Sequence, residues 1–206
     1  MINRKGILLV LSGPSGAGKG TVCHEVRKRM ENMKYSISAT TRKPRVIERE
    51  GREYFFLSKE EFEKKISEEK FLEYALVYDN YYGTPRDYVE EILNQGFDCI
   101  LEIDPQGAMQ IKEKMDDAVF IFIAPPSMDE LKKRLTFRGT EKPEEIAKRL
   151  GNAEKEFKNM PNYDYVIIND KIEEAVSEVE AIIKAEKLKT SRNHEIMNLL
   201  NKGEKK

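Results

Sequence analysis

A glycine-rich segment near the start of the chain has the residue types and spacing of a phosphate-binding loop. It follows a short apolar run and precedes an amphipathic stretch that predicts a helix. The glycines let successive backbone N–H groups turn towards an anion, and the start of the helix adds partial positive charge. Lys19 adds a mobile charge for the β- and γ-phosphates of a nucleoside triphosphate. The residues predicted to bind ATP here are Gly13, Pro14, Ser15, Gly16, Ala17, Gly18, Lys19, Gly20 and Thr21.

The loop departs from the strict phosphate-loop pattern at one position. Gly20 follows Lys19, where a Ser or Thr hydroxyl ordinarily binds Mg²⁺, and Thr21 comes one residue later. We therefore expect the Mg²⁺ that accompanies ATP to be held mainly by phosphates and waters. The missing hydroxyl also disfavours a switch-type GTPase, which depends on it.

Four later segments, taken together with this loop, resemble the guanylate kinase family. The motifs occur in the family's order and spacing, and the resemblance extends from the loop to Asn169 and Asp170. It implies a P-loop fold and Mg²⁺-dependent transfer of the ATP γ-phosphoryl group to GMP, which gives ADP and GDP. The segments are residues 36–45 (Ser-Ile-Ser-Ala-Thr-Thr-Arg-Lys-Pro-Arg), 51–56 (Gly-Arg-Glu-Tyr-Phe-Phe), 71–75 (Phe-Leu-Glu-Tyr-Ala) and 80–85 (Asn-Tyr-Tyr-Gly-Thr-Pro).

The residues that the resemblance assigns to GMP fit the chemistry of guanine. Guanine presents N1–H and N2–H₂ donors side by side, so one carboxylate can accept from both, whereas adenine N1 would face that carboxylate with a lone pair. The resemblance assigns this carboxylate to Glu73, a second one at the base edge to Asp104, and a hydroxyl for guanine O6 to Ser36. It also implies that Thr84 lies near the base. Such buried polar pairing can reject the wrong base by roughly 10⁴–10⁵.

The phosphate of GMP requires positive charge and hydroxyl donors. Arg42 and Arg45 offer planar guanidinium groups that suit a phosphate. The resemblance assigns one hydroxyl hydrogen bond each to Tyr54 and Tyr82.

Residues 131–141 and 146–150 resemble the mobile lid of the family. The resemblance assigns catalytic roles to Arg134, Arg138 and Arg149, in addition to Lys19. Mg-ATP and a monophosphate bring roughly four net negative charges together, and phosphoryl transfer depends on positioning and on stabilising that charge. Closure of the lid would also exclude water.

Two further residues lie at the carboxyl ends of predicted core strands. Glu102 stands where the family more often has Asp, which implies a position near Mg²⁺, with contact directly or through a water. Asn169 stands where the family contacts the adenine of ATP. An Asn-Asp pair also caps a helix well, so for Asn169 both interpretations stay open.

The elements that must position these residues follow from the apolar pattern. Continuous apolar runs at residues 7–11, 97–103, 118–124 and 165–168 predict buried strands of a parallel sheet. Amphipathic stretches predict helices at 21–33, 59–68, 87–94, 128–137, 143–158 and 172–188. The alternation predicts a three-layer α/β fold. Short aromatic segments at 35–37, 54–57, 72–77 and 81–83 predict a small antiparallel insert.

We therefore expect one domain over residues 1–206. Its expected parts are a core (1–33, 85–133 and 150–188), a GMP-binding insert (34–84), a lid (134–149) and a polar tail (189–206). We expect the tail to form a frayed helix. Its apolar residues allow an alternative, in which this helix docks on a partner subunit. They are Ile196, Met197, Leu199 and Leu200.

The composition limits the other partners. Lys and Arg number 36 and Asp and Glu number 37, a balance that argues against bulk binding to nucleic acid or an anionic membrane. Two cysteines, Cys23 and Cys99, fit free thiols in the cytoplasm. The sequence leaves the oligomeric state open.

Alternative functions are disfavoured by particular residues. A kinase for another monophosphate, such as AMP, would share the loop and the lid, but Ser36, Glu73 and Tyr82 count against it. A guanylate-kinase-like module that binds peptides usually loses the loop and lid residues, which this chain retains. A GTPase would also need an Asn-Lys-x-Asp motif, which the sequence lacks.

Overall fold

The computed structural model describes residues 5–137 and 143–193, and its centre is a parallel sheet. The strands pair in the order β2-β7-β1-β8-β9, and each adjacent pair is parallel. The four strands predicted for the core sheet are confirmed. The sheet consists of β1 (Leu8–Ser12), β2 (Met33–Tyr35), β7 (Asp98–Glu102), β8 (Val119–Ala124) and β9 (Tyr165–Ile168).

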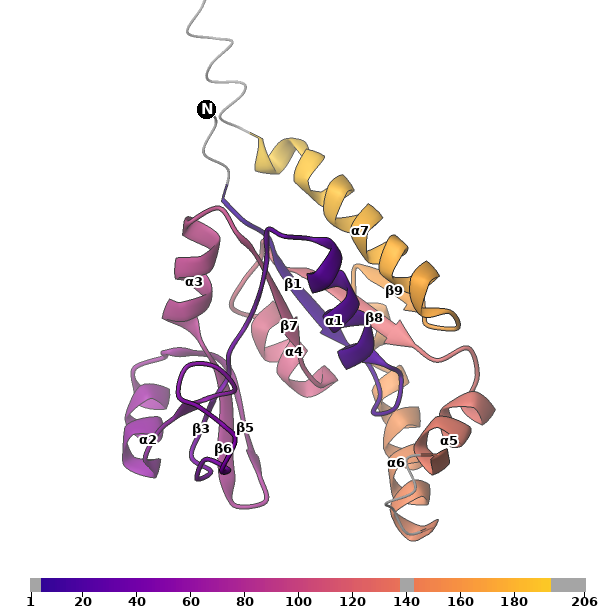
Figure 1. The fold of residues 1–206 in the computed structure, drawn as a ribbon, viewed down its shortest axis with the longest axis horizontal. Coiled ribbons are helices and arrows are strands. Elements are labelled where there is room, and N and C mark those ends of the chain that lie inside the picture. The colour runs from indigo at the N-terminus through magenta and orange to yellow at the C-terminus, as the bar shows by residue number, and fades with distance from the viewer. Residues whose placement is uncertain (1–4, 138–142, 194–206) are drawn as a thin grey trace, which may run out of the picture.

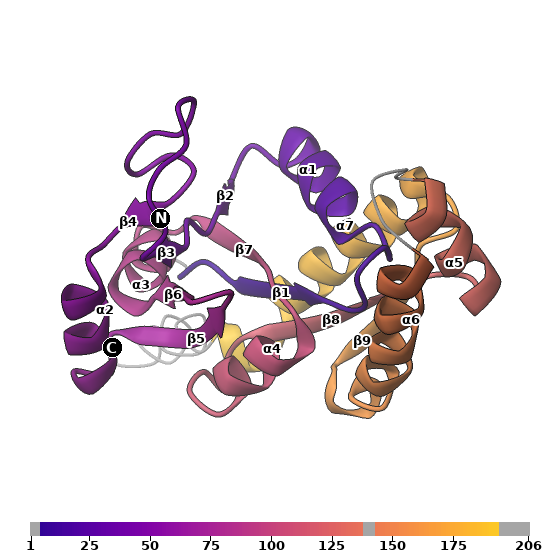
Figure 2. The ribbon, with the colours of Figure 1, turned by 90° about the horizontal axis from the view of Figure 1, so that it is seen from below.

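Helices cover both faces of this sheet, as Figures 1 and 2 show. On one face, α1 (Lys19–Arg29) and α7 (Ile172–Leu188) pack on alternate residues of β1. On the other face, α3 (Arg86–Asn94) and α4 (Pro105–Lys112) pack on the remaining ones. The predicted three-layer α/β fold is therefore confirmed. Helix α4 was not among the helices predicted from the sequence.

The position of β1 explains where a ligand can bind. Strands β7 and β8 lie on opposite sides of β1, so the chain reverses its direction of winding there. In open α/β sheets, ligands bind at the carboxyl ends of the strands at such a switch point. The predicted phosphate loop leaves the carboxyl end of β1.

The insert has its own sheet, in the order β4-β3-β6-β5. It was predicted to be antiparallel, but the sheet is mixed because β3 and β4 pair in parallel. Phe62 of α2 stacks on Phe71 at 4.2 Å and forms the core of the insert. The elements are β3 (Ala39–Thr40), β4 (Phe55–Phe56), α2 (Lys59–Ser67), β5 (Phe71–Val77) and β6 (Asn80–Pro85).

One short strand has a different partner from the one predicted. Residues 35–37 were predicted to be a strand of the insert, but β2 spans Met33–Tyr35 and pairs in parallel with β7 of the core sheet. The Ser36 backbone N–H donates to the Ile100 carbonyl at 3.0 Å and continues this pairing. A strand of three residues carries too little pattern to reveal its partner.

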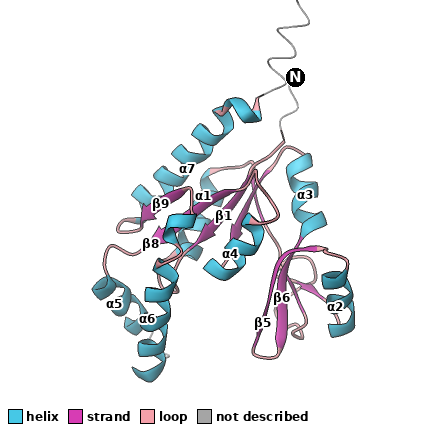
Figure 3. Cartoon of the chain, turned by 180° about the vertical axis from the view of Figure 1, so that it is seen from behind, coloured by secondary structure: helices cyan, strands magenta, loops and turns pink. Residues whose placement is uncertain are grey.

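Helices α5 (Met128–Phe137) and α6 (Pro143–Phe157) occupy the predicted lid region and extend beyond it. They and the insert lie on either side of the end of the sheet where β1 leads into the loop (Figures 1 and 3). Two short 3₁₀ helices complete the described chain, η1 (Met160–Asn162) and η2 (Thr190–Arg192). Most of the predicted tail lies outside the described residues. Within the described ranges, no helix is long and apolar enough to cross a membrane.

Candidate active site

The predicted phosphate loop joins β1 to α1 and leaves the start of that helix open to an anion. The Lys19 Nζ donates to the carbonyl oxygens of Gly13 at 2.7 Å and Pro14 at 3.2 Å, so the ammonium group turns back over the loop. Gly18 is the N-cap of α1, with φ at 90°. Among the described residues, no side chain caps this helix and none in its first turn is acidic. Its first N–H groups are therefore suited to a phosphate.

Asn169 braces this loop from the end of β9. Its buried Nδ2 donates to the Ala17 carbonyl at 2.8 Å. A Cβ at Gly18 would lie only 2.3 Å from the same Nδ2, so this close approach requires glycine. The alternative interpretation of Asn169 as a helix cap is wrong, because the N-cap of α7 is Lys171, which makes no side-chain cap.

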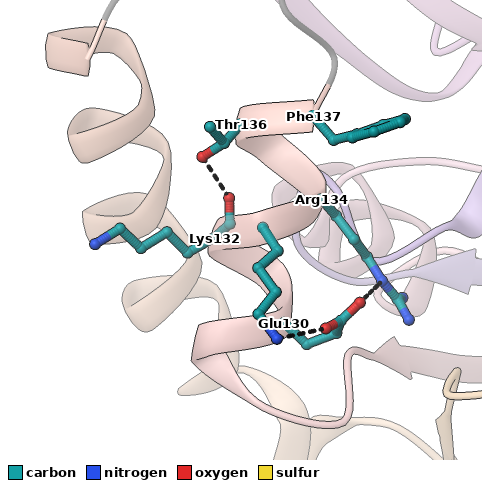
Figure 4. Close-up of a pocket in the computed structure, with 6 residues that line it drawn as sticks. Glu130, Lys132, Arg134, Thr136 and Phe137 are labelled. Carbon is teal, nitrogen blue, oxygen red and sulfur yellow. Dashed lines mark hydrogen bonds and ion pairs between the residues drawn. The ribbon is translucent and has the colours of Figure 1, made fainter.

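Helix α5 packs against the other side of the loop. A Cβ at Gly16 would lie 2.9 Å from Leu131 and from Leu135, both buried in α5. Arg134 stands between these leucines in sequence, and its Nε pairs with Glu130 Oε1 at 3.2 Å on the same helix. Both residues line a hollow of about 860 Å³, and Figure 4 shows the contact between them. Helix α5, which carries Arg134, therefore packs against the loop. The guanidinium group of Arg134, however, pairs with Glu130 of the same helix.

The other two lid arginines are less fully described. Arg149 lies on α6 and is half-buried. Arg138 lies outside the described residues.

Glu73, Thr84 and Asp104 come together at the predicted guanine site. Glu73 is 7% exposed, and its Oε1 accepts from the Thr84 hydroxyl at 2.6 Å. Burial raises the pKa of Glu73 to about 7, the hydrogen bond from Thr84 opposes this, and the nearby charge of Asp104 adds to it. The Asp104 Oδ1 caps α4 by accepting from the Gly107 N–H at 2.9 Å. One oxygen of Glu73 therefore has a neutral donor, and the other is suited to a ligand.

Ser36 presents an unsatisfied hydroxyl. The residue is 1% exposed, and its Oγ has no hydrogen-bond partner in the part of the chain that is described. A buried hydroxyl without a partner costs free energy, so a ligand atom that hydrogen-bonds to it would stabilise the site.

The predicted acceptor-phosphate residues form a second cluster, on the insert. The Arg42 guanidinium lies 5.5 Å from the centre of the Tyr54 ring, and the rings of Tyr54 and Tyr82 are 6.0 Å apart. The Arg42 Nη2 pairs with Glu48 Oε1 at 2.8 Å. Hydrogen bonds to Glu48 and to Tyr82 raise the pKa of Arg42. Arg45 is exposed, and its backbone N–H donates to the other oxygen of Glu48 at 2.7 Å.

Glu48 was not predicted from the sequence. Its hydrogen bonds from Arg42 and Arg45 lower the pKa of its carboxyl. The signal was present as an acidic residue three positions after Arg45, but a carboxylate in a basic loop usually indicates only a solvated surface.

Glu102 lies beside the start of α1. Its carboxylate oxygens are 3.3 and 3.4 Å from the point where a Cβ at Gly20 would stand. Burial raises the pKa of Glu102, and the charge of Lys19 lowers it. The space left at Gly20 therefore borders a carboxylate, which is a ligand type suited to Mg²⁺. Among the described residues there is no group of three or more His, Cys, Asp or Glu side chains placed to hold a metal ion.

Glu156 is a second acidic residue that the sequence reasoning missed. Burial raises the pKa of this half-buried carboxyl on α6, the charge of Lys19 lowers it, and Asp104 raises it. Glu156 and Asp104 line a common hollow of about 490 Å³. The signal was the helical spacing, because Glu156 follows Arg149 by seven residues and shares its face of α6.

Comparisons with known proteins agree with this geometry. A family model described as guanylate kinase matches residues 5–186. A guanylate kinase of Caldanaerobacter subterraneus subsp. tengcongensis is 52% identical over 195 residues, which cover 95% of each chain. One from Carboxydothermus hydrogenoformans is 54% identical over 188 residues, with 91% of this chain and 92% of the relative covered. The crystal structure of guanylate kinase from Anaplasma phagocytophilum is similar, with a TM-score of 0.71, 38% identity and coverage of 93% and 92%.

Proposed function

The chain belongs to the guanylate kinase family and is a nucleoside monophosphate kinase, and from this premise we propose that it transfers the γ-phosphoryl group of ATP directly to GMP. The acceptor phosphate oxygen forms a bond to the γ-phosphorus while the bond to the leaving ADP oxygen breaks. The second pKa of a phosphate monoester is about 6, so the acceptor is largely ionised at neutral pH and needs no general base.

The observation that carries the choice of GMP is the buried carboxylate of Glu73. Its Oε1 accepts from the Thr84 hydroxyl, which leaves acceptor capacity for the paired N1–H and N2–H₂ donors of guanine. Asp104 adds a second carboxylate at the base edge, and the Ser36 hydroxyl without a partner suits guanine O6. Adenine N1 carries no hydrogen, so adenine would not supply the paired donors that the remaining acceptor capacity of Glu73 requires, and this costs free energy in a buried site.

ATP binds through the loop. We assign the phosphates to the open N–H groups at the start of α1 and to Lys19, whose ammonium group would exchange the carbonyls of Gly13 and Pro14 for phosphate oxygens. Thr21, at the exposed start of the helix, belongs to the same site. We assign Asn169 a supporting role, because its amide holds the loop backbone.

Charge neutralisation accounts for most of the catalysis in this proposal. Arg42, Arg45, Tyr54 and Tyr82 bind the GMP phosphate, and the Glu48 carboxylate keeps Arg42 in place beside Tyr54. We assign the lid arginines, Arg134, Arg138 and Arg149, to the charge that the transferred group spreads over its oxygens. Positioning and preorganised charge are the main sources of catalysis in phosphoryl transfer.

Mg²⁺ fits the residues next to the loop. Glu102 would hold the ion, directly or through a water, because its carboxylate borders the space that Gly20 leaves open. The metal would neutralise phosphate charge, and most of its ligands would be phosphate oxygens and waters.

The expected division of the chain is part of the proposal. We assign GMP binding to the insert, closure over the phosphates to the lid, and ATP binding to the core. Cys23 and Cys99 are both buried free thiols, which supports a reducing compartment such as the cytoplasm.

A coupled assay of ADP release tests the function. Mg-ATP is offered with GMP, dGMP, AMP, CMP and UMP in turn, and we expect strong preference for GMP. Preference for AMP would retain the kinase reaction but refute the roles of Ser36, Glu73 and Asp104. A folded protein that phosphorylates none of them would refute the proposal and favour a binding module.

A further inference from the structure

Helix α4 and the turn after it hold the backbone of β5 on both sides of Glu73. The Gln110 side chain makes two hydrogen bonds to Tyr74: its Oε1 accepts from the Tyr74 N–H at 3.1 Å, and its Nε2 donates to the Tyr74 carbonyl at 3.1 Å. The Lys114 Nζ donates to the Phe71 carbonyl at 3.1 Å. Glu73 therefore lies between two backbone positions that are tied to the core domain.

The position of β5 explains why it needs this support. It is an edge strand of the insert sheet, so the outward N–H and C=O of Tyr74 have no neighbouring strand within the described sheet. Gln110 provides both partners with one amide, as a further strand would. The pairing with β6 is also irregular between Phe71 and Glu73, and such an irregularity redirects the side chains next to it.

The same face of α4 approaches the Glu73 carboxylate directly. A Cβ at Gly107 would lie 3.2 Å from Glu73 Oε2, a tight contact, and 2.4 Å from the tip of the Ile103 side chain, so glycine at this position lets α4 approach the carboxylate closely. Gly107 and Gln110 are three residues apart and therefore neighbours on the helix surface. Lys114 adds a positive charge that lowers the pKa of Glu73 and partly offsets its burial.

We propose that Gln110 is a positioning residue for the selection of GMP: its amide fixes β5 beside the irregular pair and so directs the Glu73 carboxylate at guanine. Gln110 itself touches no substrate in this proposal. Lys114 supports the same strand from its other end. The inference rests on the proposed role of Glu73 in binding guanine.

The test measures GMP binding without ATP, by calorimetry, in a double-mutant cycle. Gln110→Met keeps the length of the side chain but removes both hydrogen bonds, and we expect it to raise the Kd for GMP about tenfold. The Kd for ATP and the midpoint of thermal unfolding should stay close to wild type. Gln95→Met is the matched control, because Gln95 is exposed at the end of α3 and its side chain donates to Glu91, one turn earlier in the chain.

The cycle separates positioning from a general loss of structure. In a Glu73→Gln background, Gln110→Met should change the Kd for GMP less than twofold, because the carboxylate that Gln110 directs is already absent. Lys114→Met should act in the same direction as Gln110→Met.

Each contrary outcome has a distinct meaning. Failure of the wild-type protein to bind GMP would refute the proposed function itself. Normal GMP binding by wild type and by Gln110→Met would overturn only the role of Gln110. Equal losses in the wild-type and Glu73→Gln backgrounds, or a matching loss of ATP binding, would also overturn it, because Gln110 would then act independently of Glu73.

Discussion

Lowering the pH from 8 to 6 should weaken the binding of GMP to the protein about tenfold through the Glu73 carboxyl alone. Burial raises the pKa of this group by more than the hydrogen bond from Thr84 lowers it, and the resulting pKa is about 7. Guanine N1–H and N2–H₂ are both donors, so they need the ionised carboxylate. A protonated carboxyl would turn its own O–H towards one of them.

The magnitude follows from the pKa. With a pKa of about 7, about nine tenths of the Glu73 side chains are ionised at pH 8 and about one tenth at pH 6. The apparent Kd varies inversely with the ionised fraction, so it should rise about tenfold between these values. An ordinary glutamate, with a pKa of about 4.3, would stay ionised over the whole range and give no such change.

Calorimetric titration of GMP between pH 5.5 and 8.5 measures this profile. The phosphate of GMP also titrates near pH 6, but that contribution is shared by Glu73→Gln, so the difference between the two profiles isolates Glu73. The affinity of the Gln variant should be lower at pH 8 and should change less with pH. Parallel profiles for wild type and Glu73→Gln would refute the assignment of a raised pKa and of guanine binding to this carboxyl.

Three further predictions concern single substitutions. Lys19→Ala should lower turnover on the order of 10²–10³-fold without unfolding the protein, and near-normal turnover would contradict the role of the loop. In urea unfolding, the stability of Glu73→Gln relative to wild type should increase by about 3 kcal/mol as the pH rises from about 4.5 to about 7, because over this window the wild-type carboxyl ionises only in the unfolded state. A difference that does not change with pH would argue against a raised pKa of Glu73. Asn169→Ala should cost about 1–2 kcal/mol of stability and weaken ATP binding, since the Ala17 carbonyl loses its buried partner, and unchanged unfolding and ATP affinity would show that the bond contributes nothing.

The sequence predicts those parts of the molecule whose signals are local. The loop was recognisable because its glycines and Lys19 stand at fixed offsets between a strand and a helix. Strand β8 was recognisable because Val119–Ala124 is buried on both faces and so is apolar at every position. The contacts of Glu73 with Thr84 and of Arg42 with Tyr54 are seen only in the structure. The family resemblance implied only that the residues of each pair bind the same part of GMP.

The features that were missed depend on tertiary contacts. Helix α4 spans only Pro105–Lys112, and Gly107 within it weakens the helical signal, although Asp104 followed by Pro is an ordinary helix start. The parallel pairing of β3 with β4 involves two residues on each strand and leaves no periodicity to detect. In the sequence, Glu48 and Glu156 look like solvated surface residues. Only the fold places Glu48 beside Arg42, and Glu156 close enough to Lys19 for the two charges to interact.

The stability cost and the base selectivity at Glu73 have the same cause. Burial makes the ionised carboxylate of Glu73 unfavourable when no base is bound, because Thr84 donates to Oε1 while Gly107, which lies close to Oε2, has no side chain that could donate to it. Guanine supplies donors to that carboxylate, whereas a base without them leaves its charge unpaired. Ionising a more exposed Glu73 carboxyl would cost less free energy. Water would then donate hydrogen bonds to the carboxylate whichever base was bound, so the carboxylate would not distinguish the bases. The proposed selectivity for GMP therefore requires the burial, to which the close approach of α4 at Gly107 contributes.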